Sequence, residues 1–285
     1  KVMPKIPAAT CYLDNDNLNE DERGIKYANL LEEEIIKQDP ETVLAFILEP
    51  IGGASTGALV PPNSYFKRIN EICKKHDILI ITDEVMTGAG RTGKFLAGEH
   101  WNLEPDIIAM AKGFAAGYAP LGVVAAKNTI VNEINNSGGF LHGHTYAGNP
   151  LACSAGLAVL KEILSKNLIE NAHIQGITLK EKLNELKNEF SFIGDVRGKG
   201  LLVAFELVAN KETMEPLPTS MNADTLLVEE AYKKGLIIYS RKTRGGKIGD
   251  HFMICPPLVI NKKQIDEICN ILRECLKIIQ SKLNL

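Results

Sequence analysis

The sequence predicts an α/β fold with a mostly parallel sheet, followed by a smaller C-terminal α+β domain. Two observations carry this prediction. In the first half of the chain, amphipathic helical segments alternate with short apolar runs, which is the pattern of buried strands in a parallel sheet. From about residue 190 on, a few glycine-interrupted strand segments are followed by helices, which indicates an α+β unit.

The composition is that of a globular protein. The chain has 285 residues, 45% hydrophobic and 24% charged, with a formal net charge of −3. This balance gives no basic patch for nucleic acid or for an anionic membrane, and no apolar run reaches the roughly 20 residues that span a bilayer. The six cysteines form no C-x-x-C pair. We therefore expect free thiols, no metal site and a cytoplasmic location.

The first half is predicted to alternate helices and strands. Residues 1–23 read as a loop, and residues 24–38 as a helix whose apolar side chains share one face. Residues 43–48 are continuously apolar, as in a strand buried on both faces. The elements expected next are a glycine-rich loop at 52–57, a helix at 65–76, and strands at 78–82, 107–111 and 123–126.

The pattern of predicted helices and strands changes in the second half of the chain. A helix is expected at 150–164 because Pro150 stands in its first turn, and a second helix at 169–186. Strand character at 192–208 is broken by Gly194, Gly198 and Gly200. The remaining expected elements are a helix at 224–234, strands at 236–239 and 251–255, and a terminal helix at 264–283. We place the large domain at 1–165 and the small domain at 166–285.

Three apolar runs end on charged residues, namely Glu49, Asp83 and Lys112. Ligands of open α/β sheets bind outside the carboxyl ends of the strands, so these three ends predict a site. Lys112 stands among Ala and Gly residues, and a desolvated lysine can act as a nucleophile and proton shuttle. A lysine Schiff base with an Asp facing a pyridinium nitrogen indicates pyridoxal phosphate chemistry. The residues alone leave this open against a structural role, with Asp83 capping a helix.

Two other motifs are weaker. Residues 88–93 read Gly-Ala-Gly-Arg-Thr-Gly, but they do not follow a strand directly, and no good helix start follows them. We therefore interpret them as a structural turn rather than a nicotinamide site. His142 and His144 have no third ligand in sight, so they do not indicate a metal.

A succession of segments resembles the class III aminotransferases of the ω-amino-acid or acetylornithine type, which are fold-type-I pyridoxal phosphate enzymes. The matching segments are 49–57, 60–62, 82–88, 90–93, 105–106, 111–113, 117–118, 120–122, 142–146, 148–150, 195–200, 249–250 and 256–257. They run in order along nearly the whole chain. The resemblance implies a small-molecule amine donor, a 2-oxo acid acceptor and a homodimer with its site at the subunit interface.

The resemblance implies a role for each matching site residue. Lys112 would form the Schiff base with pyridoxal 5'-phosphate and move the proton during catalysis. Asp83 would pair with the pyridine nitrogen, and Val85 would pack on a ring face. Thr145 would reach the cofactor phosphate of the neighbouring subunit. Ala54 and Ser55, in the loop 53–56, would lie near the substrate.

The sequence departs from the acetylornithine-type pattern at three places, one of which is 53–55, where Gly-Ala-Ser stands instead of a segment with Glu. Met253 stands where those enzymes carry a carboxylate-binding Arg, and Met86 where they tend to carry Gln. The sequence is therefore more similar to the broad-specificity ω-transaminase branch, in which a mobile Arg binds the oxo acid. Arg244 and Arg241 are the candidates for that residue, with a solvated surface role as the alternative.

We therefore expect an aminotransferase that acts on an amine or ω-amino acid and a 2-oxo acid by a ping-pong mechanism. The alternatives are a pyridoxal phosphate aminomutase or decarboxylase, and a non-catalytic fragment that needs a separate N-terminal polypeptide. The last alternative arises because the first residue is Lys1 and the family's phosphate-binding loop has no counterpart before Glu49. On that ground we expect the family's N-terminal part to be missing, so that 1–165 holds only the later portion of the cofactor domain.

Overall fold

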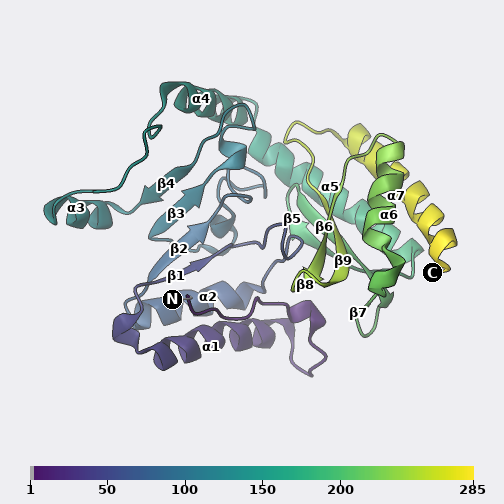
Figure 1. Ribbon diagram of the computed structural model, residues 1–285, viewed down its shortest axis with the longest axis horizontal. Helices are drawn as coiled ribbons and strands as arrows, with labels where there is room; N and C mark the ends of the chain where they lie inside the picture. Colours follow the sequence, from purple (N-terminus) through teal and green to yellow (C-terminus); the bar gives the residue numbers. More distant parts are fainter. Residues whose placement is uncertain (1–2) are drawn as a thin grey trace.

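The computed structural model describes residues 3–285, which form two β-sheets with helices packed around them (Figure 1). The first two positions of the predicted loop at 1–23 lie outside the described residues. Within residues 3–285, no helix combines the length and the apolar character that crossing a bilayer requires. All six cysteines are free, and all but Cys153 and Cys255 are buried. The domain boundary at 165/166 stays a prediction.

The first sheet has the strand order β1-β2-β3-β4. The β1–β2 and β2–β3 pairs are parallel, as predicted, but β4 runs antiparallel to β3. The segment between β3 and β4 makes only a short 3-10 turn, whereas a parallel return requires a longer crossover. The carboxyl ends of the three parallel strands therefore share one edge. The strands are β1 (Ala45–Leu48), β2 (Leu79–Asp83), β3 (Ile107–Met110) and β4 (Val123–Ala126).

Two helices, α1 (Glu20–Gln38) and α2 (Asn63–Lys75), lie below the first sheet in Figure 1. Their apolar faces form a core with Ile78 and Ile80 of the β2 region. Helix α1 begins earlier than the predicted residue 24 because Asn19 and Glu22 form a capping box at its start.

The opposite face of the first sheet is open in the described residues. Ile47 of β1 is 63% exposed and Val124 of β4 is 72% exposed. The prediction that residues 43–48 are buried on both faces is therefore wrong, because no element of residues 3–285 covers this side. Asp83 lies on the same open face, since the register places it opposite Ala109, which pairs with Val124.

An exposed apolar segment begins before β4 and continues beyond the first sheet. We use this name for residues 118–157, which include α3 (Asn128–Asn136), a helix with no counterpart in the sequence prediction, and the start of α4 (Pro150–Ser165). Figure 1 shows α3 and the connection to α4 extending away from the sheets. Its largest exposed apolar side chains are Tyr118, Phe140, Leu141, Tyr146, Leu151 and Leu157. Clusters of this kind mark interaction surfaces.

The second sheet is antiparallel, with the order β5-β6-β9-β8 and a short β7 beside β6. One of its faces packs against three helices in a large apolar core, which is the predicted α+β arrangement (Figure 1). The elements are α5 (Leu168–Glu189), β5 (Ile193–Lys199), β6 (Leu202–Asn210), β7 (Glu215–Pro216), α6 (Ala223–Lys233), β8 (Tyr239–Arg244), β9 (Ile248–Ile254) and α7 (Lys262–Leu283).

The predicted strand at 236–239 is wrong in position. The strand β8 begins at Tyr239 and continues through Arg244, where the polar sequence gave no strand signal. It is an edge strand, and charged side chains are common on edge strands because they discourage pairing with other chains.

The other face of the second sheet packs against residues that flank the loop after β1. Leu202, Ala204 and Met253 pack there against Ile51 and Ala58, which flank the loop after β1. This apolar contact holds the carboxyl-end loops of the first sheet against the second sheet.

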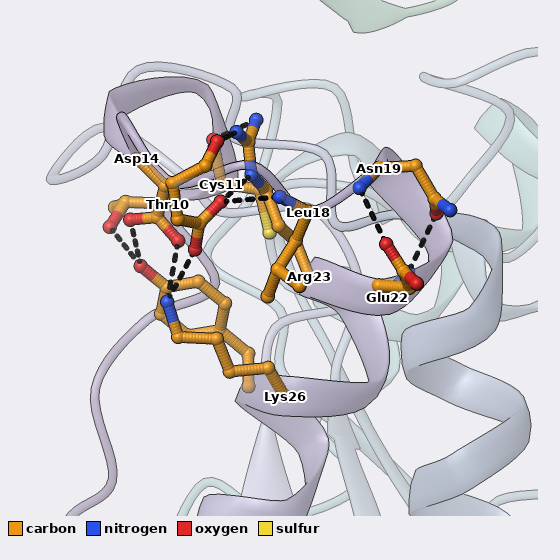
Figure 2. Close-up of polar contacts among 10 residues, drawn as sticks. Thr10, Cys11, Asp14, Leu18, Asn19, Glu22, Arg23 and Lys26 are labelled. Carbon is orange, nitrogen blue, oxygen red and sulfur yellow. Dashed lines mark hydrogen bonds and ion pairs between the residues drawn. The ribbon is translucent and has the colours of Figure 1, made fainter.

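The N-terminal segment is fixed to α1 by polar contacts (Figure 2). Arg23 Nε donates to Asp16 Oδ1 across 2.7 Å, and Lys26 contacts both Asp14 and Asp16. The Tyr27 hydroxyl donates to Asp14 Oδ1 across 2.9 Å. These contacts place residues 10–14 beside the second sheet, where Tyr12 reaches Glu206.

Candidate active site

The carboxyl ends of β1, β2 and β3 bring together the three charged residues that the sequence singles out. Glu49 follows β1, Asp83 ends β2, and Lys112 comes directly after β3 and Ala111. The β2 and β3 ends are joined by a hydrogen bond of 2.8 Å from the Glu84 backbone N–H to the Ala109 carbonyl.

The pKa of Glu49 reflects the charges at the other two strand ends. Crowding of its carboxyl group by protein atoms raises the pKa of Glu49 above the ordinary value, although the residue as a whole is exposed. The Asp83 carboxylate raises this pKa further, while the Gly53 hydrogen bond and the Lys112 amine lower it. Two carboxyl groups and one amine therefore stand at the ends of these parallel strands, and Asp83 and Lys112 both act electrostatically on Glu49.

Lys112 stands in a backbone conformation that non-glycine residues rarely adopt, with φ at +45°. Its side chain is exposed at the sheet edge, and the next residues anchor the turn, because Phe114 is buried under the sheet. Gly113 lies against the backbone at Gly88, so a side chain there would contact it. A strained conformation held in place by its surroundings is common at functional sites.

Asp83 does not cap a helix, so that structural alternative is wrong. Turns rather than a helix follow β2, and Asp83 Oδ1 accepts a hydrogen bond of 3.0 Å from the Val85 backbone N–H. This is the one hydrogen bond recorded for its side chain within residues 3–285, which leaves Oδ2 for a ligand. The turn is firm because the buried Glu84 carboxylate accepts hydrogen bonds from the Ala97 and Gly98 N–H groups.

The loop 53–57 lies beside the end of β1. Gly53 N–H donates to Glu49 Oε2 across 3.1 Å, and the Met86 sulfur lies beside Gly53. Ala54 is half-buried and Ser55 is exposed. The two predicted substrate residues are therefore connected to the strand ends through Gly53 and Glu49.

Val85 and Thr145 occupy different surroundings. Val85 is half-buried in the turn directly after Asp83. Thr145 lies on the exposed apolar segment, between α3 and α4, and no contact between it and Lys112 is recorded in the described chain. The role predicted for Thr145 in a neighbouring subunit stays a prediction.

The two candidate arginines lie on β8. Arg244 points into the second sheet, where its Nη2 donates to the Met214 carbonyl and lies 3.7 Å from Glu206 Oε1. Arg241 is exposed and pairs in register with His251, which contacts Ala54. Of the two, Arg241 is therefore the one on the side of the loop 53–57.

Met253 is buried in the apolar contact between the second sheet and the residues flanking that loop. The position is lined by Ile51, Ala58 and Ala204, so the surroundings match the apolar residue that the sequence carries there.

Residues 88–93 form a structural turn, as the sequence predicts. No α-helix begins directly after Gly93, where bends lead to a short 3-10 helix at Ala97–Trp101, and Gly90 and Gly93 have φ values of +88° and +84°. A Cβ atom at Gly93 would lie 3.0 Å from His173 of α5. Arg91 Nη1 donates to the carbonyls of Leu201 and Pro256, so the turn is attached to residues that flank strands of the second sheet.

Two buried polar residues of the second sheet, Arg197 and His251, also contact the loop 53–57. The sequence does not identify them by residue type. Arg197 lies in the motif segment 195–200 and His251 directly follows 249–250, so position in those motifs was the available signal.

Comparison with known proteins gives a consistent result. The sequence model of the family described as aminotransferase class-III matches residues 1–276. An uncharacterized aminotransferase, YodT of Bacillus subtilis, is 38% identical over 98% of this chain and 63% of its own length. A putrescine–pyruvate aminotransferase of Pseudomonas aeruginosa is 37% identical over 93% of this chain and 56% of its own length. The chain thus spans about three fifths of the length of these relatives.

A solved structure supports the same relationship at the level of the fold. The amine transaminase of an uncultivated Pseudomonas species, in a form described as PLP-bound, superposes with a TM-score of 0.84 at 36% identity. The match covers 91% of this chain and 57% of that one. The α/β fold that the motif segments imply is confirmed.

Proposed function

Because this chain belongs to the class-III aminotransferase family, we propose that it carries the reactive lysine of an aminotransferase site that transfers an amino group from an amine or ω-amino acid to a 2-oxo acid. The observation that supports this most is the position of Lys112. Its amine lies in a strained turn at the open end of the parallel sheet, near Asp83 and Glu49.

The residues at the strand ends fit the ring end of pyridoxal phosphate, the cofactor of this family. Lys112 would supply the amine for the carbonyl group of the cofactor. Asp83 Oδ2 carries no recorded hydrogen bond in residues 3–285 and suits the protonated ring nitrogen. Val85 adjoins Asp83 and offers an apolar contact for a ring face. Bound there, the cofactor supplies an electron sink for the electron pair left when a substrate C–H bond breaks.

Each residue of this chain then has a distinct task. The Lys112 amine would take the proton from the substrate carbon that bears the amino group and hold it at Nζ. From there the proton would pass to the cofactor carbon that is bonded to the same nitrogen. Asp83 keeps the proton on the ring nitrogen by accepting a hydrogen bond at Oδ2. The reaction is ping-pong, so the carbonyl product of the donor leaves before the 2-oxo acid enters.

The donor we propose is a terminal primary amine. One relative is named for putrescine and pyruvate, and the buried Met253 gives this chain no cation at that position for a donor carboxylate. Arg241, exposed beside His251, is the better candidate than Arg244 for binding the carboxylate of the 2-oxo acid, because Arg244 already has partners in Met214 and Glu206.

The exposed apolar segment supports two partners. A second copy of the chain would cover part of it and bring Thr145 to the neighbouring cofactor phosphate. A companion polypeptide, equivalent to the part of the relatives' length that this chain does not match, would cover the open sheet face that carries Ile47 and Val124. The cytoplasmic location stays a prediction.

The test is reductive trapping of the lysine. Purified protein is incubated with pyridoxal phosphate, reduced with borohydride and mapped by peptide mass spectrometry, and we expect the label on Lys112. The Lys112→Ala variant should take no label, and Lys161→Ala, which removes an exposed lysine of α4, should keep it. A label on another lysine would overturn the assignment.

A half-reaction separates transamination from the alternatives. Protein whose Lys112 can be labelled in this way is given putrescine without a 2-oxo acid. It should release one equivalent of carbonyl product per site and no carbon dioxide. Carbon dioxide release from an amino acid would identify a decarboxylase, and an isomeric amine as the product would identify an aminomutase.

A further inference from the structure

The face of the second sheet that packs against the residues flanking the loop after β1 contains a buried charged cluster. Arg197, Glu206 and His251 are 7%, 0% and 0% exposed. They lie on the three adjacent strands β5, β6 and β9. Glu206 of β6 pairs in register with His251 of β9 on one side. On the other side it pairs with Asp195 of β5, two residues before Arg197. Burying such groups is costly unless their polar atoms have partners. Glu206 Oε1 has no hydrogen bond within residues 3–285, and the partners of the other atoms indicate what the cluster is for.

The Arg197 guanidinium makes four hydrogen bonds, two to backbone carbonyls and two to carboxylates. Nε donates to the Gly57 carbonyl across 2.7 Å, and Nη2 donates to the Thr56 carbonyl across 3.1 Å. Nη1 donates to Asp195 Oδ2 and to Glu206 Oε2, at 3.0 and 2.9 Å. Four of the five N–H groups of Arg197 are thus engaged, and two of these four bonds hold the backbone of one loop.

His251 holds the same loop at a third carbonyl. Its Nε2 lies 3.0 Å from the Ala54 carbonyl oxygen, which can only accept, so Nε2 carries the proton. Burial and the Arg197 charge lower the pKa of His251 to about 4, so the ring is neutral and Nδ1 is an acceptor. The Thr243 hydroxyl donates to Nδ1 across 2.8 Å, which fixes the ring orientation.

The N-terminal segment completes the cluster. The Tyr12 hydroxyl donates to Glu206 Oε2 across 2.8 Å, and the Tyr12 ring lies 4.6 Å from the Arg197 guanidinium carbon. Glu206 thus accepts from both Tyr12 and Arg197, and holds the arginine in the orientation that reaches the loop.

The same loop also contacts the end of the first sheet. Gly57 has φ at +64° and lies so close to His251 and Arg197 that a Cβ atom would overlap both. At the other end of the loop, Gly53 N–H donates to Glu49, on whose carboxyl group Asp83 and Lys112 act electrostatically. The second sheet therefore holds the loop at Ala54, Thr56 and Gly57, while Glu49 at the end of β1 holds it at Gly53.

We propose that Arg197 and His251 are positioning residues that fix the loop 53–57 in the shape that receives the substrate. The proposal rests on the proposed aminotransferase function for the identity of the site, but the fixation of the loop is a separate property. Arg197 and His251 touch neither Lys112 nor Asp83 in any recorded contact of residues 3–285, so they act on substrate binding rather than on the reactive amine.

The matched variants are Arg197→Lys and Arg91→Lys. Both replace an arginine that donates to carbonyl groups across the two domains, but Arg91 contacts Leu201 and Pro256 and not the loop. A lysine keeps the charge of Arg197 but cannot bond two carbonyls and two carboxylates together. In the holoenzyme we expect Arg197→Lys to raise KM for the amine donor about tenfold, with reductive labelling of Lys112 unchanged. Arg91→Lys should leave KM unchanged.

Hydrogen exchange gives a readout that does not depend on activity. Amides of residues 53–58 should exchange at least about tenfold faster in Arg197→Lys than in the unaltered protein or in Arg91→Lys. His251→Gln, whose amide can still donate to Ala54, should retain slow exchange, whereas His251→Leu should lose it. Equal exchange in all variants, or equal KM changes in Arg197→Lys and Arg91→Lys, would overturn the proposal.

The two proposals fail in different ways. If Lys112 takes no label in the unaltered protein while exchange at 53–58 depends on Arg197, the aminotransferase function is wrong and the loop fixation stands. If Lys112 is labelled and the exchange rate at 53–58 does not depend on Arg197, the loop fixation is wrong and the assignment of Lys112 stands.

Discussion

His251 of the second sheet donates a hydrogen bond of 3.0 Å to the carbonyl oxygen of Ala54, a residue 197 positions earlier in the chain. The bond connects a buried neutral ring to a loop beside the end of the first sheet. It makes the geometry of the candidate site a property of both domains, because neither sheet holds this loop alone.

The buried His251 predicts a specific pH dependence of stability. Its pKa is about 4 in the folded protein and near its ordinary value of 6.5 when unfolded. Between these values only the unfolded chain binds the proton, so the free energy of unfolding falls as the pH drops from 6.5 towards 4. At about 1.4 kcal/mol per pKa unit, this group accounts for up to about 3 kcal/mol.

Urea unfolding at about pH 7 and about pH 5 would measure this loss. His251→Gln keeps the donor to Ala54 but cannot titrate, so it should lose less stability than the unaltered protein over the same interval. Arg197, Arg241 and Thr243, which also face the ring, are unchanged in that comparison. Equal losses in both proteins would show that the pKa of His251 does not differ between the folded and the unfolded protein.

Gly57 is predicted to tolerate no side chain. Its φ of +64° disfavours any L-residue, and a Cβ atom would lie 2.6 Å from the His251 ring and 2.9 Å from Arg197 Nη2. Gly235 has φ at +81° with no atom near a Cβ, so Gly235→Ala measures the backbone cost alone. We expect about 1 kcal/mol for Gly235→Ala and about 1–3 kcal/mol more for Gly57→Ala, by chemical denaturation. Equal costs would mean that the loop moves freely away from the second sheet.

Much of the first sheet could be predicted because its signals are local. The strand at 123–126 has the predicted bounds, and the ends at Glu49, Asp83 and Lys112 meet because parallel strands place their carboxyl ends at one edge. The exposure of Ile47 could not be predicted, because an apolar run does not reveal what covers it.

The parts that sequence reasoning missed depend on distant contacts. Arg197 resembles any strand arginine until the structure places it on the carbonyls of Thr56 and Gly57. The polar strand at Tyr239–Arg244 has no apolar alternation and is held by pairing with β9. Neither relationship leaves a local pattern, since both are set by tertiary packing.

Asp83→Asn tests the role of the carboxylate without disturbing the turn. The Asn side-chain oxygen can still accept from the Val85 N–H, so the melting temperature should stay the same within about 2 °C. Loss of the negative charge should lower kcat by at least about 10²-fold, while Lys112 is still labelled on reduction. A variant with kcat within a few-fold of the unaltered enzyme would show that Asp83 does not face the ring nitrogen.

Subunit mixing tests whether Thr145 serves the site of a second copy. Thr145 lies on the exposed apolar segment, and no contact with Lys112 is recorded in the described chain, so a dimer site would combine Lys112 of one copy with Thr145 of the other. Thr145→Val and Lys112→Ala should each be strongly impaired alone. Refolded together in equal amounts, half of the dimers are mixed and each has one intact site, so about a quarter of the normal activity should return. If activity in the mixture is no higher than the mean of the two separate variants, Thr145 does not act across the subunit interface.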